Sequence, residues 1–126
     1  MTHHPLSLTQ PTERPRYGLE GLDAYRVAVE LDALLVELAR QAGRGNLVVH
    51  MLEASESTVL LIAEAHPAAG ADRARRFRMA HTEASEAWAA LQLLASRGAV
   101  RGPKVDEARE LSRRLRAMLS RLGNPR

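Results

Sequence analysis

Residues 51–88 have the sequence MLEASESTVLLIAEAHPAAGADRARRFRMAHTEASEAW, and this stretch decides the fold. It contains two helical patterns joined by a short turn of Ala and Gly that begins at His66 and Pro67. Pro67 predicts the end of the first helix, because the residue before a proline disfavours the helical region. Two helical patterns on either side of so short a turn are typical of a helical hairpin.

The same periodicity extends in both directions and predicts four helices. A helix over residues 23–42 would start at a potential N-cap, Asp23, and end before Gly43. Helices over 46–65, 72–97 and 103–122 follow, the last with Pro103 in its first turn. No segment shows the alternation of a strand. We therefore expect an all-α protein with an antiparallel up-down four-helix bundle over residues 17–126, preceded by a disordered, Pro-containing arm over residues 1–16.

The helix predicted over residues 46–65 is apolar on two sides. One apolar stripe includes Val48 and Ile62. A second apolar stripe beside it includes Leu47, Met51 and Leu61. Such a helix is usually wedged between neighbours, but in so small a domain the second side can meet another subunit. We therefore predict a homo-oligomer whose interface includes Leu47, Met51, Thr58 and Leu61.

Composition restricts the compartment and the covalent chemistry. The 126 residues suit one domain, and the absence of cysteine excludes structural disulfides and thiolate metal sites. The N-terminal segment lacks the pattern of a secretory signal, and we expect no apolar stretch long enough to cross a bilayer. These features predict a cytoplasmic protein without a membrane partner.

Positive charge is concentrated near the C-terminus. Residues 1–96 contain nine arginines and twelve acidic residues, a net charge of −3, whereas residues 97–126 contain nine basic and three acidic residues, a net charge of +6. Seventeen of the eighteen basic residues are arginine, which forms bidentate contacts with phosphate. A second cluster at residues 73–78 opposes the positive end of a helix dipole, which indicates either an anionic partner or a solvated face with Glu and Asp nearby. We predict a basic surface that binds nucleic acid or a partner protein, formed by Arg73, Arg75, Arg76, Arg78, Arg109, Arg113, Arg116 and Arg121.

Binding by this surface should depend on charge, because aromatic stacking platforms are lacking. Aromatic side chains make up 3% of the chain, and we assign Phe77 and Trp88 to the core. Contacts with nucleic acid would then be electrostatic, insensitive to sequence and strongly dependent on salt.

No catalytic constellation is present in the sequence. A di-iron bundle needs Glu-x-x-His, but the residues three before the helical histidines are Leu47, Ala63 and Arg78. There is no cysteine nucleophile, no Gly-x-Ser-x-Gly elbow and no Gly-rich phosphate loop. We expect no enzyme activity and no cofactor or metal. The alternatives are a purely structural assembly protein and a small metal-dependent enzyme that uses the carboxylates of the second and third helices, Glu53, Glu56, Glu64, Glu83 and Glu86.

Packing motifs on three helices resemble those of a known family. The chain is similar to the bacterial four-helix-bundle proteins found in intervening sequences of large-subunit ribosomal RNA genes, and to the related accessory variability proteins of diversity-generating retroelements. The family's Ser-Ile-Pro-Ala-Asn-Ile-Ala-Glu-Gly-like segment is matched in the second helix, but Val59, Leu61 and Ala65 replace its Pro, Asn and Gly. The matching positions are Ser57, Ile62, Ala63 and Glu64, with Tyr25 and Ala28 in the first helix and Phe77, Ala80 and Glu86 in the third.

The resemblance implies an assembly protein without catalytic activity. Members of this family form small homo-oligomers, typically a ring of five bundles. The retroelement branch is a basic barrel that binds a reverse transcriptase and nucleic acid, which implies the same partners for a member with a basic C-terminal third.

Overall fold

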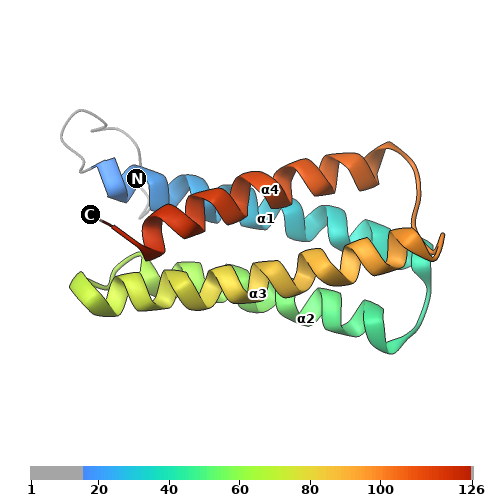
Figure 1. The fold of residues 1–126 in the computed structure, drawn as a ribbon, viewed down its shortest axis with the longest axis horizontal. Coiled ribbons are helices and arrows are strands. Elements are labelled where there is room, and N and C mark those ends of the chain that lie inside the picture. Colours follow the sequence, from blue (N-terminus) through green and yellow to red (C-terminus); the bar gives the residue numbers. More distant parts are fainter. Residues whose placement is uncertain (1–15, 126) are drawn as a thin grey trace, which may run out of the picture.

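The computed structural model describes residues 16–125 and contains four helices in this range, with no strand. They are α1 (Arg16–Ala42), α2 (Asn46–Ala65), α3 (Gly70–Ser96) and α4 (Pro103–Gly123). Each helix runs antiparallel to the one before it (Figure 1). α1 and α3 each pack against both α2 and α4, so the helices occupy the corners of a square. The all-α, four-helix prediction is confirmed for the described residues.

The predicted helix ends are correct where a strong stop or start signal exists and wrong elsewhere. α2 has the predicted bounds, and α4 starts at Pro103. α1 starts at Arg16 instead of Asp23, so the N-cap prediction is wrong and Asp23 is an exposed residue within the helix. The buried side chain of Leu22, 2% exposed, helps to hold these additional turns on the bundle. Residues 1–15 of the predicted arm lie outside the described range, and Arg16 already belongs to α1.

Leucine and alanine fill most of the core. The apolar stripe of α1 is buried at Val27, Leu31, Leu34, Leu35 and Leu38. α3 contributes mainly small side chains, which let its neighbours approach closely because the distance between helix axes depends on the side chains at the contact. The buried alanines of α3 are Ala74, Ala80, Ala84, Ala87 and Ala90, and its largest core residue is Phe77, which is 0% exposed as predicted.

Two of the predicted oligomer-interface residues are core residues of a single chain. Met51 and Thr58 are 0% and 2% exposed, and the Thr58 hydroxyl donates a hydrogen bond of 2.8 Å to the Ala54 carbonyl. Their assignment to an interface is therefore corrected, because a second copy cannot reach side chains that the four helices already enclose. Leu47 and Leu61 are half-buried and pack against the edge of the same core.

α2 also corrects the expectation about membrane-spanning length. Its 20 residues, with a mean hydropathy of 1.2, are long and apolar enough to cross a bilayer. The core helix of a soluble bundle meets the same two criteria, and α2 packs against both α1 and α3. One polar link to α1 is a hydrogen bond of 2.8 Å that the buried Ser55 hydroxyl donates to an oxygen of Asp32.

Candidate nucleic-acid interface

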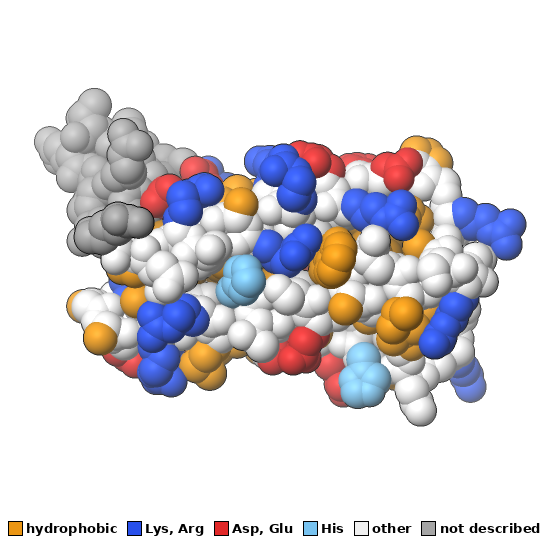
Figure 2. Space-filling view, in the orientation of Figure 1, with side chains coloured by type: hydrophobic (Ala, Val, Ile, Leu, Met, Phe, Trp, Pro, Cys, Tyr) orange, Lys and Arg blue, Asp and Glu red, His pale blue; other side chains and the backbone are white. Residues whose placement is uncertain are grey.

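The bundle carries opposite charge on its two halves. α4 contains six basic and three acidic residues, whereas α2 contains three glutamates and no lysine or arginine. α3 and α4 are neighbours, so the two arginine groups predicted from the sequence belong to one half of the molecule. Figure 2 shows this face, on which lysine and arginine side chains spread along the bundle with acidic side chains between them.

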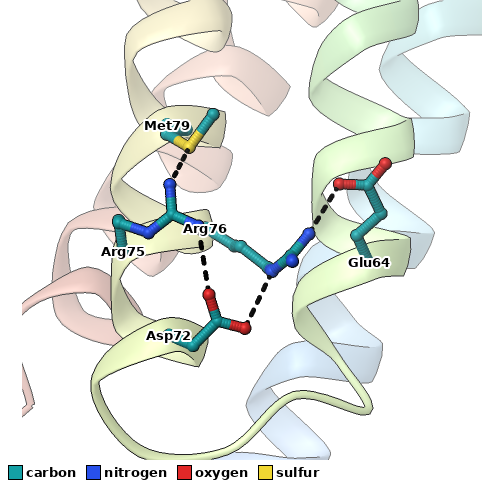
Figure 3. A network of polar contacts seen from close by, with 5 residues as sticks. All are labelled: Glu64, Asp72, Arg75, Arg76 and Met79. Carbon is teal, nitrogen blue, oxygen red and sulfur yellow. Dashed lines mark hydrogen bonds and ion pairs between the residues drawn. The ribbon is translucent and has the colours of Figure 1, made fainter.

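Two arginines at the start of α3 are neutralised by carboxylates. Arg76 contacts Glu64 of α2 at 3.0 Å and Asp72 at 3.1 Å, and Arg75 contacts the other oxygen of Asp72 at 3.1 Å (Figure 3). Arg75 also donates to the sulfur of Met79 at 3.3 Å. Hydrogen bonds from Arg76, then from Arg75, hold the pKa of Asp72 below its ordinary value. The positive end of the α3 dipole therefore lies beside arginines whose charge is balanced by carboxylates, and not beside a cluster of unpaired positive charge.

Three arginines outside this network also contact carboxylates. Arg113 binds Glu110 at 2.6 Å, and this hydrogen bond lowers the pKa of Glu110. Arg109 lies 3.4 Å from Asp106 and donates a shorter hydrogen bond of 2.6 Å to Gln92 of α3. Arg121 lies 3.6 Å from Glu20 of α1. Five of the eight predicted binding arginines thus have part of their charge compensated within the chain.

The other three predicted arginines have contacts with aromatic rings or a carbonyl, and for Arg78 and Arg116 no carboxylate contact exists within the described residues. The guanidinium of Arg73 lies 4.7 Å from the centre of the Phe77 ring. Arg78 donates a hydrogen bond of 2.8 Å from Nη1 to the carbonyl of Gly123, at the end of α4. The guanidinium of Arg116 lies over the Trp88 ring, 4.4 Å from its centre. A carbonyl or an aromatic face orients a guanidinium without cancelling its charge, so Arg78 and Arg116 remain cationic groups at the surface of the bundle.

These contacts join α3 to α4 along a line that we call the α3–α4 seam. Its residues follow in opposite order on the two antiparallel helices: Arg78 meets the end of α4, Trp88 meets Arg116, and Gln92 meets Arg109. Trp88 is half-buried, so its assignment to the core is wrong. Its helical position does turn towards the bundle, but one ring face is covered by an arginine of α4 instead of by apolar side chains.

Three further arginines on this half were not assigned to the surface from the sequence. Arg97 and Arg101 lie at and after the end of α3, and Arg101 donates from Nε and Nη2 to the carbonyl of Gly98, each at 3.2 Å. Arg114 is exposed on α4 and forms no hydrogen bond or ion pair within residues 16–125. The sequence signal for all three arginines was the positive net charge of residues 97–126. A net charge counts residues and does not show on which face of a helix each of them lies.

The carboxylates of α2 and α3 do not form a metal centre in the described part of the chain. No three His, Asp or Glu side chains within it are close enough together to hold an ion. Glu64 is engaged by Arg76, and Glu53 and Glu56 are exposed on α2.

An open, mostly apolar groove lies between α1 and α2. Its volume is about 600 Å³, and Val36, Val49 and Leu52 are among the side chains that line it. Val49 is 51% exposed. The charged residues that line the groove are Arg40 and Arg44, beside the turn between the two helices.

No protein-family model matches this chain, and no curated protein matches it.

Proposed function

We propose that this chain is a non-enzymatic four-helix-bundle protein that binds nucleic acid through its α3–α4 face. The observation that supports the proposal is the set of arginines on this half that no carboxylate neutralises. Arg78 donates to a carbonyl and Arg116 lies over an aromatic ring, and neither contacts a carboxylate within the described residues. Arginine in this state binds phosphate at little cost, because no internal ion pair must first be broken.

The arginines that are already paired add to the positive field but bind less directly. Exposed ion pairs such as Arg113 with Glu110 contribute little to stability, so a phosphate can displace the carboxylate. Contacts of this kind are insensitive to base sequence. They also release counterions, and roughly three to five phosphate contacts would give a slope of about −2 to −4 in a plot of log affinity against log salt concentration.

Charge reversal at a single exposed position tests the location of the site. We expect Arg78→Glu to weaken binding of a structured RNA several-fold at low salt and to reduce the salt slope by about one. Arg26→Glu is the matched control, because Arg26 is an exposed arginine of α1 that changes the net charge by the same amount. Electrophoretic mobility shift at two salt concentrations measures both. Equal losses in the two variants would place binding elsewhere, and no shift of the wild type at low salt would exclude the function.

The proposal includes self-association, which makes the bundle a scaffold. The apolar groove between α1 and α2 supports this part, because an exposed apolar surface of this kind favours a protein partner. It lies between helices other than those that form the α3–α4 seam. A ring of five copies in the cytoplasm, and a protein partner such as a reverse transcriptase, are the forms that the family resemblance implies.

A further inference from the structure

We propose that the α3–α4 seam binds single-stranded nucleic acid, with an unpaired base stacked on the guanidinium of Arg116. This inference rests on the proposed function and adds to it a preference for unpaired strands. It starts from the contact between Arg116 and Trp88, which the sequence did not predict.

The Arg116 guanidinium is held as a flat, charged surface. It lies over the Trp88 ring at 4.4 Å, and no carboxylate contacts it within the described residues. Its Nε atom is buried and makes no hydrogen bond. Within residues 16–125 the two Nη atoms also make no hydrogen bond, and they are not fully buried. The aromatic ring below therefore fixes one face of the guanidinium plane.

A second polar atom next to this position is also unsatisfied. Ser112 lies one helical turn before Arg116, is 2% exposed, and its hydroxyl oxygen makes no hydrogen bond. Buried polar groups in proteins are almost always paired, so two unpaired groups one turn apart distinguish this part of α4 from the rest of the helix.

A planar arginine discriminates between paired and unpaired bases. Unpaired bases stack on aromatic rings and on guanidinium planes, because their faces are open. In a duplex the base faces are already stacked on each other, and only phosphates and groove edges remain accessible. Proteins that bind single strands combine such stacking with a basic path for the backbone. Arg78 and Arg109 provide cationic groups in the seam on either side of Arg116, at different distances along the bundle.

The length of the seam fits a short strand. The 14 helical steps from Arg109 to Gly123 span about 21 Å of α4, at about 1.5 Å per residue. A stacked strand advances about 3.4 Å per nucleotide, so roughly six nucleotides cover the seam. An oligothymidylate of about 12 nucleotides, roughly twice this length, is therefore a suitable probe.

The intrinsic fluorescence of the protein tests the stack directly, because Trp88 is the single tryptophan in the chain. We expect the single-stranded probe to quench and shift the Trp88 emission. A duplex of the same length should bind through the arginines and change the emission much less.

A charge-preserving variant separates stacking from charge. Arg116→Lys keeps the positive charge and removes the plane, so we expect it to weaken binding of the single strand about tenfold and to leave duplex binding nearly unchanged. Arg26→Lys on α1 is the matched control and should alter neither. Fluorescence anisotropy of labelled probes measures the affinities, and circular dichroism checks that each variant folds.

The outcomes separate this inference from the proposed function. Binding of both probes with equal affinity, an unchanged Trp88 emission and no effect of Arg116→Lys would overturn the stacking platform and leave a charge-based nucleic-acid protein. No binding of either probe at low salt would overturn both. The emission of the wild-type protein decides the question even if the lysine variant does not fold.

Discussion

Gly123 lies where α3 and α4 approach each other most closely. A Cβ atom at this position would lie 2.7 Å from Cγ of Arg78 and 3.2 Å from its backbone nitrogen. The Gly123 carbonyl also accepts the hydrogen bond from Arg78. One residue without a side chain thus permits both the contact between the helices and the orientation of an arginine in the seam.

We expect Gly123→Ala to destabilise the fold, although the same change within an exposed helix is usually favourable. Alanine would gain about 0.5 to 1 kcal/mol of helix propensity, but forcing a methyl group into a filled space costs about 1 to 3 kcal/mol. The expected net loss is about 1 to 2 kcal/mol in the free energy of unfolding, measured by urea denaturation. Gly45→Ala is the control, because no atom lies within 4 Å of a Cβ there. A more stable Gly123→Ala protein would contradict this packing.

At the residue scale, the sequence identified apolar core positions well and polar roles poorly. Phe77 follows the helical stripe and is fully buried, as predicted. Trp88 follows the same stripe but is only half-buried, because the stripe passes from the core to the groove between two helices. Helical spacing gives the direction of a side chain and not the residue that covers it.

The start of α3 shows how an element is stabilised without a side-chain cap. Its N-cap residue is Ala69, whose side chain can accept no hydrogen bond. Asp72 lies in the first turn instead, where a carboxylate interacts favourably with the helix dipole. It also holds Arg76 in position to reach Glu64, so one carboxylate connects the start of α3 to α2.

We expect the stability contributed by Asp72 to depend on pH. Its pKa in the folded protein is below the ordinary value of 3.8, so the contribution is fully present above that value and is lost as pH falls through the folded pKa. Asp72→Asn should lower the urea midpoint at neutral pH, and the difference from the wild type should shrink as pH falls below 3.8 and through the lower folded pKa. Asp23→Asn, at an exposed position of α1, is the control. A difference that persists unchanged in acid would show that charge is not the cause.

At the element scale, a proline at or near a helix end made that end predictable. Pro103 starts α4, and Pro67 follows the end of α2, because proline restricts backbone geometry in any context. The starts of α1 and α3 have no comparable signal. Asp23 and Asp72 are good capping residues by type, but Asp23 follows earlier turns of α1 and Asp72 lies within the first turn of α3.

The whole molecule has two chemically different sides. α1 and α2 together contain eight acidic and three basic residues, with the apolar groove between them. α3 and α4 together contain ten basic and six acidic residues. Such an arrangement lets a protein contact one partner through apolar surface while it presents positive charge to another.

We expect Val49→Glu to reduce self-association. Val49 is half-exposed in the groove, so a glutamate there adds charge to the apolar surface without disturbing the core. Sedimentation velocity at micromolar concentration measures the mass of each species. Leu93→Glu is the matched control, because Leu93 is 47% exposed on α3, away from the groove. A monomeric wild-type protein, or an oligomer that both variants leave intact, would contradict the assignment of the interface.

At the scale of the molecule, the partners of the arginines could not be predicted from the sequence. Arg76 and Glu64 are 12 residues apart and belong to different helices, and Arg116 and Trp88 are still farther apart. Such pairs depend on the register between neighbouring helices, which is set by the packing of the whole core. The basic residues in this half could therefore be counted from the sequence. Which of them lie beside a carboxylate that balances their charge could not be predicted from it.

The ends of the described chain lie together. α1 begins and α4 ends at the same end of the bundle, where Arg121 lies 3.6 Å from Glu20 (Figure 1). Attachment to a surface through a label or a tether after Pro125 would therefore place this end of the bundle nearest the surface. The opposite end, with the turns at residues 43–45 and 97–102, would point away from the support. Protein immobilised in this way would expose the full length of all four helices to solution, which suits measurements of surface binding and force.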